Sequence, residues 1–194
     1  MDHLDLIRAQ FPNLTDADIG EVLPLLIVRE LAAGEVFIRA GQVNYTSAFV
    51  VKGLLRNYHL LDNGTERTVL FTAEGGTIAA YASFFRNMPS VEYIAALEPT
   101  FLLTVDMRAL RKIMDNNLGL TQAYTQTLER MLLDAIDRID CFVLLSPEQR
   151  YTQFRHHHLE LEQRIPQKHL ASYLGITAIS LSRMRNRMVK RKLT

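Results

Sequence analysis

Apolar residues near the C-terminus follow a helical spacing that one glycine interrupts. Leu170, Ala171 and Leu174 stand at i, i+1 and i+4, which places them on one face of a short helix. Gly175 then breaks the pattern, at a corner that needs a residue tolerant of positive φ. Thr177 can cap a second helix through its hydroxyl. The apolar face of that second helix holds Leu181, Met184 and Met188. The pattern predicts a helix-turn-helix.

A longer helical pattern precedes this motif, over residues 118–144, and it lacks Gly and Pro after Gly119. One apolar seam has the alternating 4 and 3 spacing of a coiled coil, and it consists of Leu128, Leu132, Ala135, Ile139 and Phe142. A second apolar stripe runs beside it through Leu133, Ile136 and Val143. Two stripes predict a helix that packs on its own chain with one and on a partner helix with the other. The predicted dimer interface is the seam, which leaves the second stripe to cover the chain's own roll. The alternative is a core helix with a single apolar face.

The segment before this helix has the residue pattern of short β-strands. Residues 29–105 contain short β-rich runs separated by glycines, which is typical of a small barrel or jelly roll. The runs 54–61 and 67–72 flank an Asn-Gly turn signal and predict a hairpin. Residues 1–28 are predicted to be helical, with Thr15 and Asp18 as a capping pair. Further runs are 35–39, 47–51, 91–97 and 100–105, and Asp106 can cap a short helix through Met114.

A domain boundary is predicted at Ser146, which can form a capping box with Gln149 around Pro147. The helix that begins there is expected to end near Gln163, and residues 164–166 form a linker. The chain is therefore predicted to be an α+β protein with an N-terminal antiparallel β-roll or jelly roll, a long dimerisation helix and a C-terminal helix-turn-helix. The expected domains are 1–116, 117–145 and 146–194.

Charge is distributed unevenly along the 194 residues, although the formal net charge is only +1. Residues 147–194 hold ten Lys and Arg against three Glu, while the rest holds twelve basic and eighteen acidic residues. This asymmetry indicates a basic module for a polyanion. Cys141 is the only cysteine, which excludes an internal disulfide and a four-cysteine iron–sulfur site. No signal peptide or membrane-spanning run is visible, so we expect a cytoplasmic protein.

The order of these elements resembles the Crp/Fnr superfamily of transcription regulators, named for the cyclic-AMP receptor protein and the fumarate–nitrate regulator. The most specific similarities are the glycine pattern, the stretch Ser146–Arg150 and the stretch Ile165–Thr177. The resemblance implies a cyclic-nucleotide-binding-like sensor, a homodimer through the long helix, and a C-terminal domain that binds a palindromic promoter site in double-stranded DNA. RNA polymerase is a candidate further partner.

The sensor departs from the cyclic-nucleotide pattern. Members that bind cyclic AMP carry Gly-Glu after the glycine corner and Arg-Ser further on, for the ribose and the phosphate. Ala79-Ala80 and Ser90-Val91 stand at those positions here, and a lost contact to phosphate removes a strong charge-assisted bond. The candidate effector pocket consists of Ile78, Ala79, Ala80, Tyr81, Arg86, Ser90 and Val91, with Arg86 as the substitute cation. We therefore predict no useful affinity for cyclic AMP, and the effector stays unidentified.

The DNA-reading helix also differs from the family pattern. Ile179 stands where many members have Glu, and it can touch a thymine methyl group but cannot accept from cytosine. Arg183 has the forked donors that grip guanine, and Lys168 opens the first helix, where a phosphate is favoured. The candidate DNA-binding residues are Gln167, Lys168, His169, Thr177, Ala178, Ile179, Ser180, Ser182, Arg183, Arg185 and Arg187. The alternative is an ordinary αα-hairpin with a solvated basic face.

Other chemistries have little support. A haem site would need a ligand such as His59, and a lone strand histidine is usually solvated. His156–His158 cannot all face one metal ion, because adjacent helical residues point about 100° apart. Cupin-type catalysis needs clustered His and Glu ligands, so we expect no enzyme, no metal and no cofactor. The leading hypothesis is a sequence-specific regulator with a degenerate nucleotide pocket. The alternative is a small-molecule sensor that binds a cyclic nucleotide or another effector through non-standard pocket residues.

Overall fold

The computed structural model describes the backbone of residues 3–192 and the side chains of residues 5–188. The chain forms two compact units. The first contains Met1–Asn57 and Phe71–Leu133, and the second contains Tyr58–Leu70 and Asp134–Thr194. Each unit is described by itself below.

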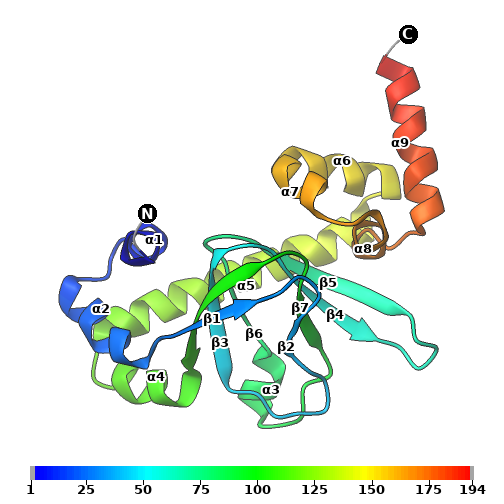
Figure 1. Ribbon diagram of the computed structural model, residues 1–194. Helices are drawn as coiled ribbons and strands as arrows, with labels where there is room; N and C mark the ends of the chain where they lie inside the picture. The colour runs from blue at the N-terminus through cyan, green and yellow to red at the C-terminus, as the bar shows by residue number, and fades with distance from the viewer. Residues whose placement is uncertain (1–2, 193–194) are drawn as a thin grey trace. The chain divides into compact units, whose positions relative to one another are not determined.

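The predicted β-roll is present, as two four-stranded sheets (Figure 1). One has the order β1-β8-β3-β6, and β8 pairs antiparallel with both β1 and β3. Its strands are β1 (Ile27–Leu31), β8 (Thr100–Asp106), β3 (Thr46–Lys52) and β6 (Thr77–Ala79). The other has the order β2-β7-β4-β5. Its strands are β2 (Val36–Ile38), β7 (Tyr93–Ala96), β4 (Leu55–Leu60) and β5 (Glu66–Thr72).

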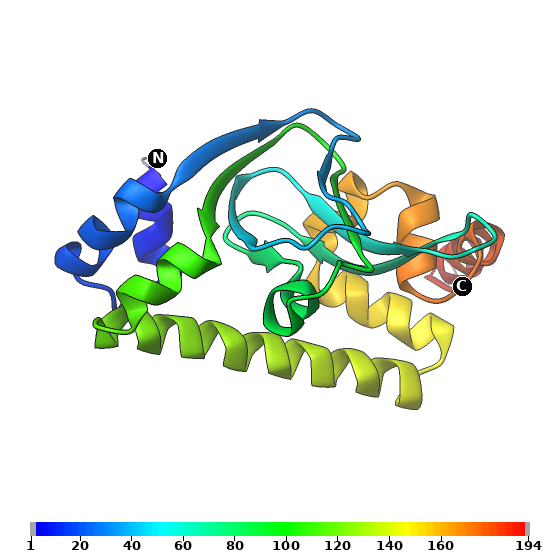
Figure 2. The ribbon, with the colours of Figure 1, turned by 90° about the horizontal axis from the view of Figure 1, so that it is seen from below.

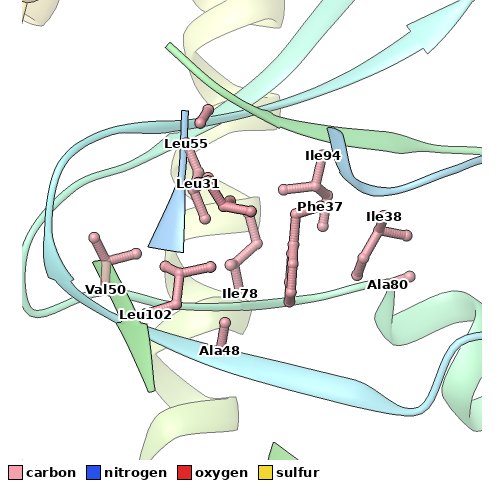
Figure 3. Close-up of a cluster of buried hydrophobic side chains, with 11 residues drawn as sticks. Leu31, Phe37, Ile38, Ala48, Val50, Leu55, Ile78, Ala80, Ile94 and Leu102 are labelled. Carbon is pink, nitrogen blue, oxygen red and sulfur yellow. The ribbon is translucent and has the colours of Figure 1, made fainter. Parts of the chain in front are cut away.

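The core of the first unit lies between the sheets and is apolar (Figure 3). Successive strand residues point to opposite faces, so Ala48 and Val50 of β3 face the core while Ser47 and Phe49 face away. The remaining core members are Leu31, Phe37, Ile38, Leu55, Ile78, Ala80, Ile94, Ala96 and Leu102. Burial of these side chains is what holds the roll closed.

The N-terminal helices follow the predicted caps. α1 (His3–Gln10) precedes α2 (Asp16–Val22), and Thr15 forms the expected capping box with Asp18. A 3-10 turn, η1 (Leu23–Leu25), ends this region, and β1 starts at Ile27, so the helical prediction through residue 28 ran slightly too far. α4 (Met107–Met114) begins at its predicted cap Asp106. β6 and α3 (Tyr81–Arg86) were not predicted, because neither is long enough to show a period.

The long helix α5 (Leu118–Leu144) has the predicted bounds and is uninterrupted (Figure 2). Its residues 118–133 belong to the first unit and residues 134–144 to the second. The residues that it buries are Leu120, Ala123 and Thr127, all in its first half.

The second unit is helical apart from the hairpin tip. α6 (Pro147–His157) starts in the predicted capping box of Ser146 and Gln149. The prediction of one helix to Gln163 is wrong, because His158 leaves the helical region at φ −137° and ψ 44° and separates α6 from α7 (Leu159–Arg164). α8 (Gln167–Tyr173) and α9 (Ala178–Lys192) follow as the predicted pair.

Candidate functional site

The corner between α8 and α9 is built as the sequence indicates. Gly175 has φ +72°, and the N–H of Ile176 donates to the carbonyl of Ala171 at 3.0 Å. The hydroxyl of Thr177 accepts from the N–H of Ser180 at 3.1 Å, which caps α9. The apolar faces of the two helices meet in a closed core made by Leu170, Ala171, Leu174, Leu181 and Met184. Packing therefore fixes which face of α9 turns outward.

The outward face of α9 carries Ile179 and the residues three, four and seven positions after it. Ile179 is 65% exposed, and Ser182, Arg183 and Asn186 are exposed beside it. Ser180 and Arg187 are also exposed, while Ala178 is half-buried. Asn186 was missing from the predicted set, although its position seven residues after Ile179 places it on the same stripe. Its amide is a group that can pair with the edge of adenine.

Arg185 is placed differently from the prediction. Its Nε donates to the hydroxyl of Tyr151 at 2.8 Å, and its Nη2 donates to Glu162 at 2.9 Å. Glu162 also accepts from Arg155 at 2.8 Å and from the hydroxyl of Tyr151. Arg185 is thus used inside the second unit, so we leave it out of the DNA-contacting set. The spacing of residues along α9 could not predict the pairing of Arg185 with Glu162, because Glu162 lies on a different helix.

The remaining predicted DNA-binding residues lie at the start of α8, which is bonded to the start of α9. Gln167 donates its side-chain amide to the carbonyl of Ala178 at 2.9 Å, which ties the first turns of the two helices together. Lys168 is exposed and His169 is half-buried. An exposed cation at a helix start suits a phosphate contact.

Two arginines that were not predicted as functional residues support the end of α8. Arg138 donates to the carbonyl of Tyr173, and its guanidinium lies 3.5 Å from the Tyr173 ring centre. Arg150 donates to the carbonyl of Leu174 at 3.1 Å and to that of Leu145 at 2.8 Å. Burial lowers the pKa of Arg138. Carbonyls at a helix end lack helical partners, so these donors satisfy them.

Phe142 lies between the same two arginines. Their guanidiniums are 4.4 Å and 4.7 Å from its ring centre, for Arg138 and Arg150 respectively. Phe142 was predicted in the dimer seam, and it now has contacts within its own unit as well. Cation–π contacts of this kind hold the end of α5 against the helix-turn-helix corner.

The tip of the β4–β5 hairpin is bonded to α8 within the second unit. Ser172 accepts from the N–H of Thr68 at 2.9 Å and donates to the carbonyl of Glu66 at 3.1 Å. One hydroxyl thereby pairs with one backbone N–H and one backbone carbonyl of β5. Nothing in the local sequence signals this contact, because the partners are more than one hundred residues apart.

Both apolar stripes of α5 are exposed. In the seam, Leu132 and Ile139 are each 61% exposed, Ala135 is exposed and Leu128 is half-buried. The second stripe was predicted to cover the chain's own roll, and this is wrong: Leu133, Ile136 and Val143 are exposed as well. The covering face instead consists of Leu120, Ala123 and Thr127.

The candidate effector-pocket residues do not converge on one site. Ile78 and Ala80 are buried in the roll core and Ala79 is 5% exposed, whereas Arg86 and Val91 are exposed. Ser90 is buried, and its hydroxyl bonds to both backbone groups of Glu92 at 3.0 Å. Tyr81 lines a different, apolar cavity.

Two buried polar residues of β4 were not selected from the sequence. Arg56 and Asn57 are 3% and 7% exposed, and Asn57 donates to Glu92 at 2.9 Å. Among the described residues, no group of three or more His, Cys, Asp or Glu is arranged to hold a metal ion. No helix in the described part of the chain is both long enough and apolar enough to span a bilayer.

Comparisons with known proteins agree with this geometry. Residues 28–117 match the family model of the cyclic nucleotide-binding domain. No curated protein sequence matches the chain.

Solved structures resemble nearly the whole chain. The c-di-GMP-responsive global regulator CLP of Xanthomonas campestris has a TM-score of 0.75 at 15% identity, covering 92% of this chain and 94% of that one. FixK2 from Bradyrhizobium japonicum has a TM-score of 0.73 at 17% identity, covering 86% of each chain. A Crp/Fnr-family structure from Eubacterium rectale has a TM-score of 0.72 at 21% identity, covering 94% of this chain and 88% of that one.

Proposed function

We propose that this chain is a homodimeric, sequence-specific DNA-binding transcription regulator. Residues 28–117 match the family model of the cyclic nucleotide-binding domain, and the chain has the architecture of the Crp/Fnr regulators. The observation that carries the proposal is the outward face of α9. A helix whose inner side is packed on α8 presents Ile179, Ser182 and Arg183 on its exposed first turns. The recognition helix of a helix-turn-helix reads base edges with those turns.

Each exposed group has a chemistry that suits DNA. Arg183 can donate twice to guanine O6 and N7, Asn186 can pair with adenine N6 and N7, and Ile179 can contact a thymine methyl group. Lys168 and Arg187 can pair with phosphates, which adds affinity without sequence preference. The half-site is thus proposed to contain a guanine read by Arg183.

The proposed dimer forms through α5. Its seam consists of Leu128, Leu132, Ala135, Ile139 and Phe142, all exposed except the half-buried Leu128, and is an apolar surface that a second copy would cover. A two-fold dimer presents two α9 helices and therefore binds a palindromic site in double-stranded DNA. RNA polymerase stays a candidate partner, and a chromosomal target implies action in the cytoplasm.

The effector pocket is proposed to be degenerate. The roll interior holds a cluster of buried apolar side chains, with Ala80 at the position of the family's carboxylate and Ser90 at the position of its cation. Domain limits at 116/117 and 145/146 are proposed from the caps of α5 and α6.

The proposal is tested by selecting bound duplexes from a randomised library at two salt concentrations. We expect a palindromic consensus whose preference at one base pair per half-site is lost in Arg183→Ala, at a cost of about 1–3 kcal/mol. Lys168→Ala should weaken all duplexes alike and flatten the salt dependence. Absence of any consensus for the wild-type chain would refute sequence-specific binding, and a uniform loss for Arg183→Ala would make Arg183 a phosphate contact.

A further inference from the structure

The end of α8 is attached to three different elements through three consecutive residues. The hydroxyl of Ser172 is bonded to β5. The carbonyl of Tyr173 accepts from Arg138 of α5. The carbonyl of Leu174 accepts from Arg150 of α6 at 3.1 Å. Because α5 and α6 directly precede this part of the chain and β5 belongs to the β4–β5 hairpin, Ser172 is the attachment that depends on the hairpin.

The Ser172 hydroxyl lies against the outer edge of β5. This strand stands at the end of the order β2-β7-β4-β5, so no strand in the described part of the chain pairs with that edge. The carbonyl of Thr65 points toward β4, where it accepts from the N–H of Leu61 at 2.9 Å. Backbone groups alternate in direction along a strand, so the Glu66 carbonyl and the Thr68 N–H both point outward. Ser172 accepts from one at 2.9 Å and donates to the other at 3.1 Å, as a neighbouring strand would, and we call these two bonds the Ser172 clip.

A movement of α8 is passed on to α9, because the two helices share one core. Leu170, Ala171 and Leu174 of α8 are buried together with Leu181 and Met184 of α9. Closely packed interiors have little free volume and move as units. The Ser172 clip therefore acts on the direction of α9 as well as on that of α8.

The hairpin is the part of the roll's second sheet that belongs to the second unit, since that unit contains Tyr58–Leu70. β4 starts at Leu55, which is buried in the roll core, and β5 ends at Thr72 in the first unit. Two continuous strands thus connect the core of the sensor roll to the Ser172 clip.

We propose that Ser172 is a positioning residue through which the β4–β5 hairpin sets the direction of α9, and thereby the half-site spacing that a dimer accepts. This inference rests on the proposed function and names the sensor strand that controls it. Base reading within one half-site depends on the side chains of α9, whereas binding of two half-sites depends on the separation and direction of two helices. The second contact adds affinity only where the geometry permits both. The clip therefore affects palindromes and not a single half-site.

The test compares Ser172→Ala with Ser172→Thr, which keeps the hydroxyl, in the full-length chain. Affinity is measured for palindromes of the selected consensus whose half-site spacing varies in single base pairs, and for a duplex with one half-site. We expect Ser172→Ala to weaken the best palindrome roughly fivefold, the fold-change of one neutral hydrogen bond, and to flatten the spacing preference. The single half-site should bind as it does to the wild type, and Ser172→Thr should restore the wild-type profile. The Thr68 amide should exchange faster in Ser172→Ala, as measured by NMR.

Thr152→Ala is the matched control, because its hydroxyl is exposed and donates to the carbonyl of Glu148 in its own helix, so its removal should change neither readout. Circular dichroism checks the folding of each variant. If Ser172→Ala does not fold, Ser172→Val against Ser172→Thr makes the same comparison with side chains of equal shape.

The inference is overturned if the hydroxyl-free variant keeps the wild-type spacing profile, weakens the palindrome and the single half-site equally, or binds the palindrome more tightly. A wild-type chain that selects no consensus would refute the proposed function and this inference together, so the two failures are distinguishable.

Discussion

A Cβ atom on Gly175 would lie 2.8 Å from Cε1 of Phe142. The glycine at the helix-turn-helix corner is thus required twice, by its φ of +72° and by the aromatic ring of α5 that occupies the space of a side chain. The corner of the proposed DNA-reading motif and the end of the long helix are consequently packed as one body.

Gly175→Ala is expected to destabilise the second unit by about 3 kcal/mol, because left-handed strain and overpacking add. Gly64→Ala is the matched control, since Gly64 has φ +78° and a Cβ atom added there would meet no other atom within 4 Å, and it should cost only about 1 kcal/mol. Urea unfolding followed by circular dichroism measures both variants. Equal losses would mean that the Phe142 contact has no energetic role, and partial rescue of Gly175→Ala by Phe142→Leu would support it.

Glu162→Gln is expected to destabilise the second unit by about 2 kcal/mol, because Glu162 pairs with Arg155 and Arg185 at a position where its side chain is 13% exposed. The two arginine side chains are 37% and 32% exposed, which screens the pairing and keeps the effect below that of a fully buried pair. Glu160→Gln removes the same charge from an exposed site on α7 and should be neutral within about 0.5 kcal/mol.

A double-mutant cycle of Glu162→Gln and Arg185→Ala checks the assignment of Arg185. Losses that are less than additive indicate that the two side chains act together inside the unit. Fully additive losses, with a change in base preference for Arg185→Ala, would return Arg185 to the DNA-contacting set.

Leu132→Glu is expected to convert the proposed dimer to a monomer, since a carboxylate placed in an apolar interface loses its hydration without gaining a partner. Gln126→Glu introduces the same charge on an exposed position of α5 outside the seam and should leave the dimer intact. Multi-angle light scattering at micromolar concentration measures both. A Leu132→Glu variant that stays dimeric would show that the seam is misplaced.

Cyclic AMP is expected to give no saturable binding, because Ala80 is buried in an apolar core and Ser90 is bonded to Glu92. Isothermal titration calorimetry with the full-length chain measures this. Micromolar binding would contradict the degenerate pocket, and Arg86→Ala would then show whether Arg86 holds the phosphate.

The sequence by itself determined the elements whose signals are local. The caps at Thr15, Asp106 and Ser146, the bounds of α5 and the α8–α9 pair were all predicted, because helix ends and helical periods depend on neighbouring residues. The departure from a nucleotide-binding pattern was also visible in Ala80 and Ser90, since it rests on residue identity alone.

Only the tertiary structure decided which polar side chains are used inside the protein. Arg185 and Arg183 are two residues apart on one helix, and spacing gives no reason to assign one to Glu162 and the other to the outer surface. The same holds for Arg138 and Ser172, whose roles depend on partners supplied by distant segments. Packing of distant segments selects one neighbour for each side chain, and a local pattern does not contain that choice.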